Sequence, residues 1–263
     1  MKDYLNLRNK VILVSGGYGH LGSAICKDLI SLGASVYCLG KSRSKFISVF
    51  SDLIKTGNNI YFMKTNVISE KSVKLSVKNI LLKEKKINVL INNAINSKFR
   101  GFDSNIALKD WSDNLKNVIQ GYFLLSKYCA EVMKKQRSGK IINISSLFGM
   151  LAPNKKMHLN LKNEPPISMV VGKGGINQLT KYLASLLGPY NVNVNSVSPG
   201  WFPKKKKGAK ERKDYIRQLT SRIPLNRIGM PQEVTGVVSL LSSDKSSYIT
   251  GQNFIIDGGY SIW

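Results

Sequence analysis

The chain has 263 residues, 43% of them hydrophobic, and 40 basic against 15 acidic side chains give it a net charge of +25 at pH 7. This length suits one globular domain, and no apolar stretch approaches the ~18 residues that a membrane span needs. The cysteines Cys26, Cys38 and Cys129 lie far apart without a C-x-x-C pair. We therefore expect reduced thiols, no metal site and a cytoplasmic protein without a membrane partner.

The basic excess is a property that nucleic-acid-binding proteins share. Lysine greatly outnumbers arginine, however, whereas paired hydrogen bonds to phosphate favour arginine. The lysines are spread along the chain, with one dense run at 204–207 that we interpret as a solvated loop or, alternatively, as a grip on an anionic ligand. We accordingly do not expect nucleic acid as a partner.

Short apolar runs alternate with longer amphipathic stretches along the whole chain. Taken in order, the expected strands are Val11–Ser15, Ser35–Leu39, Ile60–Lys64, Val89–Asn92, Lys140–Ile144, Asn193–Val197 and Asn253–Ile256. The expected helices between them are His20–Leu32, Lys45–Lys55, Glu70–Leu82, Trp111–Gln136, Met169–Leu187 and Pro231–Leu241.

This alternation predicts an α/β fold, a Rossmann-type doubly wound sheet of about seven mostly parallel strands with helices on both faces. Ligands of such sheets bind at the carboxyl ends of the strands. No repeat or linker divides the sequence, so residues 1–263 are expected to form a single dinucleotide-binding domain.

A glycine-rich segment follows the first expected strand and opens a helix. Gly16, Gly19 and Gly22 would allow a tight turn and a close approach of main-chain N–H groups to a pyrophosphate. The second strand ends at Gly40, where an NAD-binding protein commonly carries an acid, and Lys41 and Arg43 follow. Cations without an acid favour NADP over NAD, unless they are ordinary surface cations.

Taken together, the motifs resemble those of the short-chain dehydrogenase/reductase superfamily over essentially the whole chain. They are S15-G-G-Y-G-H-L-G22, N92-N-A94, N143-I-S-S146, the lysine of Y-x-x-x-K, S198-P-G200 and D257-G-G259. The resemblance implies NAD(P)-dependent hydride transfer. It also implies cofactor contacts at Gly16, Tyr18, His20, Leu21, Gly22, Lys41, Ser42, Arg43, Asn66, Val67, Asn93, Ala94, Lys173, Pro199, Gly200 and Phe202.

The same resemblance implies a catalytic Asn–Ser–Tyr–Lys tetrad, which this chain matches only in part. Ser146 fits the serine, with Ser145 beside it, and Lys173 fits the lysine that holds the nicotinamide ribose and lowers the tyrosine pKa. Met169 stands at the tyrosine position and Val118 at the asparagine position, with Asn117 one residue away. A thioether has no exchangeable proton, and loss of a general acid typically costs about 10²–10⁴-fold in rate.

Ser146 and Met169 lie 23 residues apart, and the extra segment at about 153–166 resembles that of a subgroup linked to bacterial surface-sugar and flagellin-glycosylation pathways. The resemblance implies a sugar-like substrate and places this insertion over the substrate crevice. His158 within it is the alternative proton donor.

Two functions stay open. One is an NAD(P)(H)-dependent oxidoreductase of weak activity on a sugar-like alcohol or ketone. The other is a catalytically inactive protein that binds dinucleotide or partners an active paralogue. Members of the family pair through the two long helices, so we expect a homodimer or homotetramer. Ile176, Leu179, Leu183, Leu186 and Leu187 on the second helix support this, although burial against its own sheet would also explain them.

Overall fold

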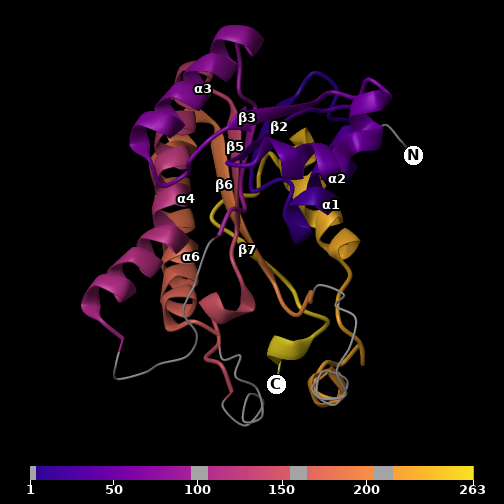
Figure 1. The fold of residues 1–263 in the computed structure, drawn as a ribbon, viewed down its shortest axis with the longest axis vertical. Helices are drawn as coiled ribbons and strands as arrows, with labels where there is room; N and C mark the ends of the chain where they lie inside the picture. Colours follow the sequence, from indigo (N-terminus) through magenta and orange to yellow (C-terminus); the bar gives the residue numbers. More distant parts are fainter. Residues whose placement is uncertain (1–3, 96–105, 155–164, 204–215, 263) are drawn as a thin grey trace.

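The computed structural model describes residues 4–95, 106–154, 165–203 and 216–262. They form one parallel sheet of seven strands in the order β3-β2-β1-β4-β5-β6-β7, with helices on both faces (Figure 1). The predicted fold class is therefore confirmed. The strands are β1 (Val11–Ser15), β2 (Ser35–Gly40), β3 (Ile60–Lys64), β4 (Val89–Asn92), β5 (Gly139–Ile144), β6 (Val192–Pro199) and β7 (Asn253–Ile256).

The helices match the expected stretches with shifts of a few residues at their ends. They are α1 (His20–Ser31), α2 (Arg43–Lys55), α3 (Glu70–Glu84), α4 (Leu108–Gln136), α6 (Ile167–Leu187) and α8 (Thr235–Ser242). The last expected helix is divided, because its first residues, Pro231–Val234, form the short 3-10 helix η3. Among the described helices, none has the length and apolar character needed to cross a membrane.

Alternation along the buried strands sends neighbouring side chains to opposite faces of the sheet. Ile12 and Val14 of β1 pack with α1, α2 and α8, whereas Val11 and Leu13 pack with α3, α4 and α6. Two apolar cores result, one on each face. Cys26, Cys38 and Cys129 lie inside them as buried free thiols, as the sequence predicts.

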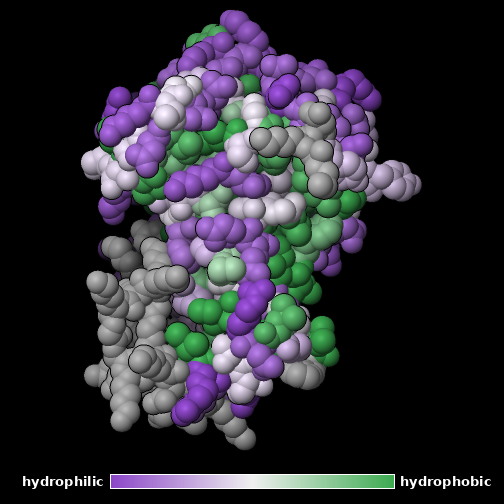
Figure 2. Space-filling model, turned by 90° about the vertical axis from the view of Figure 1, so that its right-hand side faces the viewer, coloured by the Kyte–Doolittle hydropathy of each residue, from purple (hydrophilic) through white to green (hydrophobic). Residues whose placement is uncertain are grey.

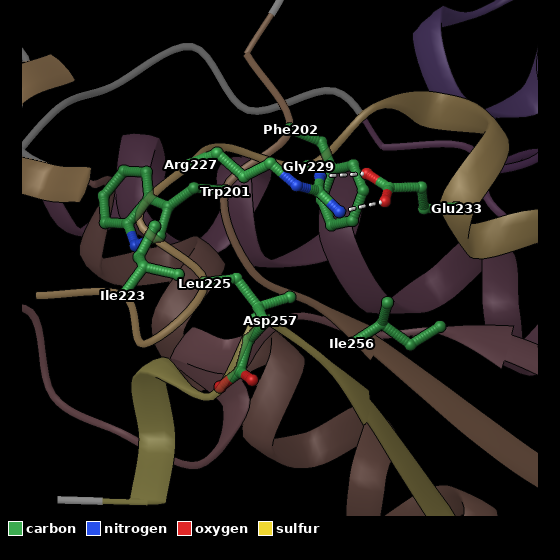
Figure 3. A pocket seen from close by; sticks show the side chains of 10 residues that line it. Trp201, Phe202, Ile223, Leu225, Arg227, Gly229, Glu233, Ile256 and Asp257 are labelled. Carbon is green, nitrogen blue, oxygen red and sulfur yellow. Dashed lines mark hydrogen bonds and ion pairs between the residues drawn. The ribbon is translucent and has the colours of Figure 1, made fainter.

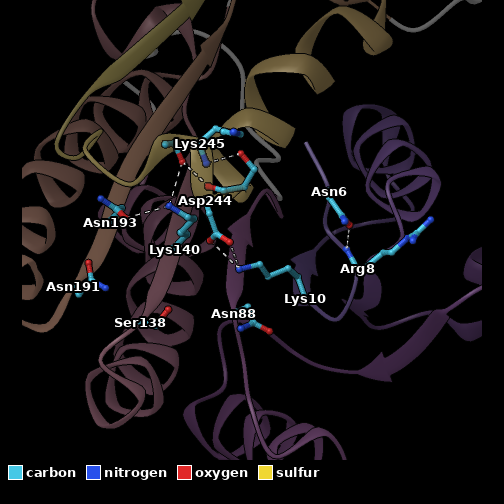
Figure 4. Close-up of polar contacts among 12 residues, drawn as sticks. Asn6, Arg8, Lys10, Asn88, Ser138, Lys140, Asn191, Asn193, Asp244 and Lys245 are labelled. Carbon is cyan, nitrogen blue, oxygen red and sulfur yellow. Dashed lines mark hydrogen bonds and ion pairs between the residues drawn. The ribbon is translucent and has the colours of Figure 1, made fainter. Parts of the chain in front are cut away.

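Polar contacts brace the amino-terminal end of the sheet, opposite the predicted crevice (Figure 4). Lys140, at the start of β5, donates to Asn193 Oδ1 and Ser246 Oγ, each at 3.2 Å. Lys10 forms an ion pair with Asp244 at 2.8 Å. Burial lowers the pKa of Lys140 to about 8, so this buried lysine needs its two acceptors.

The surface of the face turned toward the viewer in Figure 2 is mixed. Hydrophilic side chains predominate over its upper half, and hydrophobic ones show in the middle and lower parts.

Candidate functional site

A large cavity lies at the carboxyl ends of β1, β2, β3 and β4, where the strand order turns from β2 to β4 around β1. Its volume is about 610 Å³, which is within the range of ligand pockets. The lining residues come from the loops after these strands and from α1, α2 and α4: Gly16, Tyr18, Gly19, His20, Leu21, Leu39, Gly40, Lys41, Lys45, Thr65, Asn66, Val67, Ile68, Asn93, Ala94, Ile95 and Asn117.

The loop after β1 forms one wall of this cavity. Gly16 has φ +64°, which disfavours other residues, and a Cβ there would lie 3.0 Å from the Cα of Ala94. The Asn93 side-chain amide donates to the carbonyls of Ser15 and Gly16, both at 3.1 Å. Ser15 Oγ in turn accepts from the N–H groups of Asn93 and Ala94, at 2.9 and 3.0 Å. The loop is therefore held from below by the loop after β4.

Tyr18 closes the end of the cavity next to β2. Its ring lies over Gly40, where a Cβ would come 2.5 Å from Tyr18 Cε1. The Tyr18 hydroxyl accepts the N–H of Ser42 at 3.1 Å. Gly40 thus provides the space that the Tyr18 ring occupies, which the sequence alone did not indicate.

Two cations flank this end. Lys41 and Lys45 both line the cavity and are exposed. Lys45, in the first turn of α2, was not singled out from the sequence, whereas Lys41 precedes the helix. Arg43 begins α2, is exposed, and is not among the described residues that line the cavity.

The cavity contains two buried polar atoms without a hydrogen-bond partner among the described residues. They are His20 Nε2, at the start of α1, and Asn66 Oδ1, after β3. Buried polar groups are normally paired, so unpaired ones that line a cavity fit a ligand that supplies the missing partners. Together with the glycine loop at a helix N-terminus, they fit a dinucleotide: a pyrophosphate near Gly16 and His20, and an amino group near Asn66.

Other predicted contact residues lie beside the cavity rather than in its lining. Gly22 lies in the first turn of α1 and Ser42 caps α2. Pro199 ends β6, and the N–H of Gly200 donates to Ile256 O at 2.8 Å. Phe202 lines a separate cavity of about 80 Å³ with Trp201, where Arg227 and Glu233 form a paired salt bridge (Figure 3).

The residues aligned with the tetrad lie on η1, α4 and α6. Ser146 caps the 3-10 helix η1 (Leu147–Gly149), and its Oγ accepts the N–H of Phe148 at 3.2 Å. The Ser146 proton is therefore available to another acceptor. Ser145, the alternative, donates to the Lys173 carbonyl at 3.2 Å and is buried. Among the described residues, Ser145 thus has an acceptor for its hydroxyl proton, whereas Ser146 Oγ serves as an acceptor.

Met169 lies in the first turn of α6, half-buried, one turn before Lys173. Val118 is fully buried in a small apolar cluster with Tyr122 and Ile176, between α4 and α6. Asn117, one residue earlier, lines the cavity instead. The helical rotation between neighbouring residues therefore separates the two: the amide lies at the cavity and the valine lies in the core.

Lys173 is 4% exposed and is not among the described residues that line the cavity. Its Nζ donates to Tyr122 Oη at 3.0 Å and to the Ile144 carbonyl at 2.5 Å. Burial lowers the pKa of this amine to about 7. The alternative proton donor His158, the run at 204–207 and most of the 153–166 insertion lie outside the described residues.

Known proteins resemble this chain over nearly its full length. The family model described as Enoyl-(Acyl carrier protein) reductase matches residues 19–261. A 3-oxoacyl-[acyl-carrier-protein] reductase FabG of Aquifex aeolicus is 33% identical over 256 residues, covering 97% of this chain and 98% of its own. An uncharacterized oxidoreductase of Thermotoga maritima is 31% identical over 260 residues, covering 97% of each.

Solved structures share the fold at 25% identity or more, among them the following two. The short chain dehydrogenase of Leptospira borgpetersenii with bound NAD+ is 28% identical, with a TM-score of 0.86 and coverage of 99% of this chain and 96% of that one. The putative gluconate dehydrogenase of Agrobacterium tumefaciens is 25% identical, with a TM-score of 0.88 and coverage of 97% of each.

Proposed function

The chain belongs to the short-chain dehydrogenase/reductase family of NAD(P)-dependent oxidoreductases, and on this basis we propose that it binds NADP(H) and transfers hydride slowly to or from a sugar-like ketone or alcohol. The observation that carries the proposal is the 610 Å³ cavity. It combines a braced glycine loop with atoms of His20 and Asn66 that have no hydrogen-bond partner in the described part of the chain.

The preference for NADP over NAD rests on the end of β2. Gly40 leaves no carboxylate for a ribose 2′-hydroxyl, and Lys41 and Lys45 place two cations at this end of the cavity. A 2′-phosphate would be attracted by both, whereas NAD lacks that charge. Because both cations are exposed, the preference is expected to weaken at high salt.

The sugar-like substrate is supported by the likeness to the putative gluconate dehydrogenase of Agrobacterium tumefaciens. The FabG relative of Aquifex aeolicus is instead named for reduction of an oxoacyl thioester. Sugar ketones and acyl ketones therefore both belong in the assay, and the relative rates distinguish the two substrate classes.

A bound nicotinamide would supply or accept the hydride. Among this chain's residues, Ser146 can donate its proton to a substrate oxygen, since its own Oγ already accepts from Phe148. No proton donor stands at residue 169, so the proton would arrive through water or from His158, which lies outside the described residues. The expected rate is lower by about 10²–10⁴-fold than with a positioned general acid.

The second candidate function is a protein that binds dinucleotide without turnover, alone or with an active paralogue. The observation that favours it is the packed cluster around Val118, which puts an apolar side chain where a water-mediated proton path would need a polar group. Cofactor binding is common to both candidates, so turnover separates them.

Assembly as a homodimer or homotetramer is also part of the proposal. Ile176 and Leu187 are buried within the subunit, whereas Leu186 and Phe123 are each 51% exposed on α6 and α4. Apolar side chains on both long helices support pairing through these helices. Light scattering at physiological salt tests this, and a monomer would contradict it.

The test of turnover follows NADPH oxidation at 340 nm with a panel of sugar ketones and acyl ketones. Slow oxidation that depends on a ketone and is reduced by Ser146→Ala supports the enzyme. Tight NADPH binding without any ketone-dependent oxidation supports the non-catalytic alternative. Fast oxidation would contradict the consequence drawn from Met169.

A further inference from the structure

Three buried groups from different elements meet between the sheet and helices α4 and α6. Lys173 Nζ donates to Tyr122 Oη at 3.0 Å and to the Ile144 carbonyl at 2.5 Å. Tyr122 Oη donates to the same carbonyl at 2.7 Å. The three contacts form a closed triangle, and the exposed fractions of Lys173 and Tyr122 are 4% and 1%.

The surroundings of this triangle are apolar. Val118 and Tyr122 lie one turn apart on α4, and they pack with Ile176, which lies on α6 one turn after Lys173. Gly172 lets the two helices approach closely, because a Cβ there would come 2.5 Å from Val118 Cγ1. On this side the amine is thus enclosed by hydrocarbon, and its polar partners are the phenol and the carbonyl.

These two partners satisfy the amine. Desolvation lowers the Lys173 pKa to about 7, and the neutral form of the amine, which predominates above that pH, has two N–H donors. One donor is used by Tyr122 and the other by Ile144. A ligand in the cavity would have to break one of these contacts in order to bind Nζ, and would leave a buried acceptor short of its partner.

We propose that Tyr122 is a positioning residue that, together with the Ile144 carbonyl, holds Lys173 inside the core and away from the cofactor. In this chain Lys173 then stabilises the α4–β5–α6 packing instead of holding the nicotinamide ribose. Two measurements test this inference. The first uses NADPH and so rests on the proposed dinucleotide binding, whereas the second needs no cofactor. It gives a second reason for slow turnover, independent of Met169.

The first measurement is the dissociation constant of NADPH for Lys173→Met, a change that keeps the length of the side chain and removes its donors. We expect the constant to change by less than threefold, while the melting temperature falls. A rise of more than threefold would overturn the proposal, because it would show that the amine binds the cofactor. Lys181→Met, an exposed position on the same helix, is the matched control and should alter neither quantity.

If Lys173→Met does not fold, Tyr122→Phe answers the same question. Loss of the phenol hydroxyl frees one N–H of the amine, so NADPH should bind equally well or more tightly. Binding weakened by more than threefold would show that Tyr122 instead presents the lysine to the cofactor, and would overturn the proposal.

The second measurement needs no cofactor. In a double-mutant cycle of Tyr122→Phe and Lys173→Met, the unfolding equilibrium constants should be coupled by roughly two- to tenfold, the value of a typical hydrogen bond. Additive effects would contradict the contact itself. If the wild type binds neither NADPH nor NADH, the proposed function fails, and this cycle still decides whether Tyr122 holds Lys173.

Discussion

The ring of Tyr18 lies over the Cα of Gly40, so closely that a side chain at residue 40 would collide with it. Tyr18 belongs to the loop after β1, and Gly40 ends β2. Gly40 stands where an NAD site commonly has an acid, and Tyr18 covers this end of the cavity. The two positions therefore depend on each other structurally. Conversion to an NAD-type site requires a change at both.

Gly40→Asp alone is expected to weaken binding of NADPH and of NADH, because the new carboxylate displaces Tyr18 from its contact with Ser42. Gly40→Asp combined with Tyr18→Ser should bind NADH more tightly than NADPH. Titration of both cofactors checks this. Gly236→Asp, on an exposed helix position with nothing near its Cβ, is the control and should leave both constants unchanged. NADH preferred by Gly40→Asp alone would show that Tyr18 does not restrict the site.

Asn93→Leu should weaken NADPH binding by roughly tenfold, because it removes the two hydrogen bonds that hold the carbonyls of Ser15 and Gly16. Without them the loop no longer has a fixed shape before the ligand arrives. Calorimetric titration measures the change. An unaltered constant with a lowered melting temperature would show that Asn93 supports the fold but not the cofactor loop.

Lys173 makes the stability depend on pH in a defined window. Its folded-state pKa is about 7 and its ordinary value is 10.5, so between these values the unfolded chain binds the proton that the folded chain has released. The free energy of unfolding of the wild type relative to Lys173→Met should therefore rise as the pH increases from about 7 to 10.5. The slope is about 1.4 kcal/mol per pH unit at most.

Denaturant unfolding of both proteins across this window measures that difference. Other titrating groups, such as Lys140, are present in both proteins and cancel. A difference that does not vary with pH would mean that the amine keeps its ordinary pKa and is not buried.

Met169→Tyr should raise ketone-dependent oxidation of NADPH at least about tenfold, because it places a phenol one turn before Lys173. Adding Tyr122→Phe should raise it further, since the released lysine can then lower the phenol pKa. Met169→Phe is the matched control, with the ring but no exchangeable proton, and should give no gain. An equal gain from Met169→Phe would point to a packing effect.

Val118→Asn is expected to lower stability rather than to restore the tetrad. Val118 is fully buried against Gly172, so an amide there would lose its water contacts without a partner. The melting temperature checks this. A stable Val118→Asn protein with faster turnover would show that the α4–α6 contact opens to admit a polar group.

The fold was predictable from the sequence because buried parallel strands and amphipathic helices leave distinct periodic patterns. Val11–Ser15 and Val89–Asn92 were located to the residue. The glycine loop after the first strand placed the cavity, since ligands of a doubly wound sheet bind at the carboxyl ends of its strands. Helix ends were less accurate because capping and 3-10 turns, as at Pro231–Val234, depend on local contacts.

The contacts within the site were not predictable in the same way. The pairing of Tyr18 with Gly40 joins residues from two loops, and the sequence gives no sign of which ring covers which glycine. Tyr122 falls on the expected helix Trp111–Gln136, and its position there gives no indication that it binds Lys173 across the α4–α6 interface. Such relationships depend on side-chain packing between distant segments, which periodicity does not report.

The most direct test of the cavity as a dinucleotide site is a calorimetric titration of NADPH into the wild type and into Gly16→Val. Gly16 has a positive φ and lies against Ala94, so a valine must distort the loop. Saturable 1:1 binding by the wild type that Gly16→Val abolishes is the predicted result. Absence of heat with both NADPH and NADH, or undiminished binding by Gly16→Val, would contradict the assignment of this cavity.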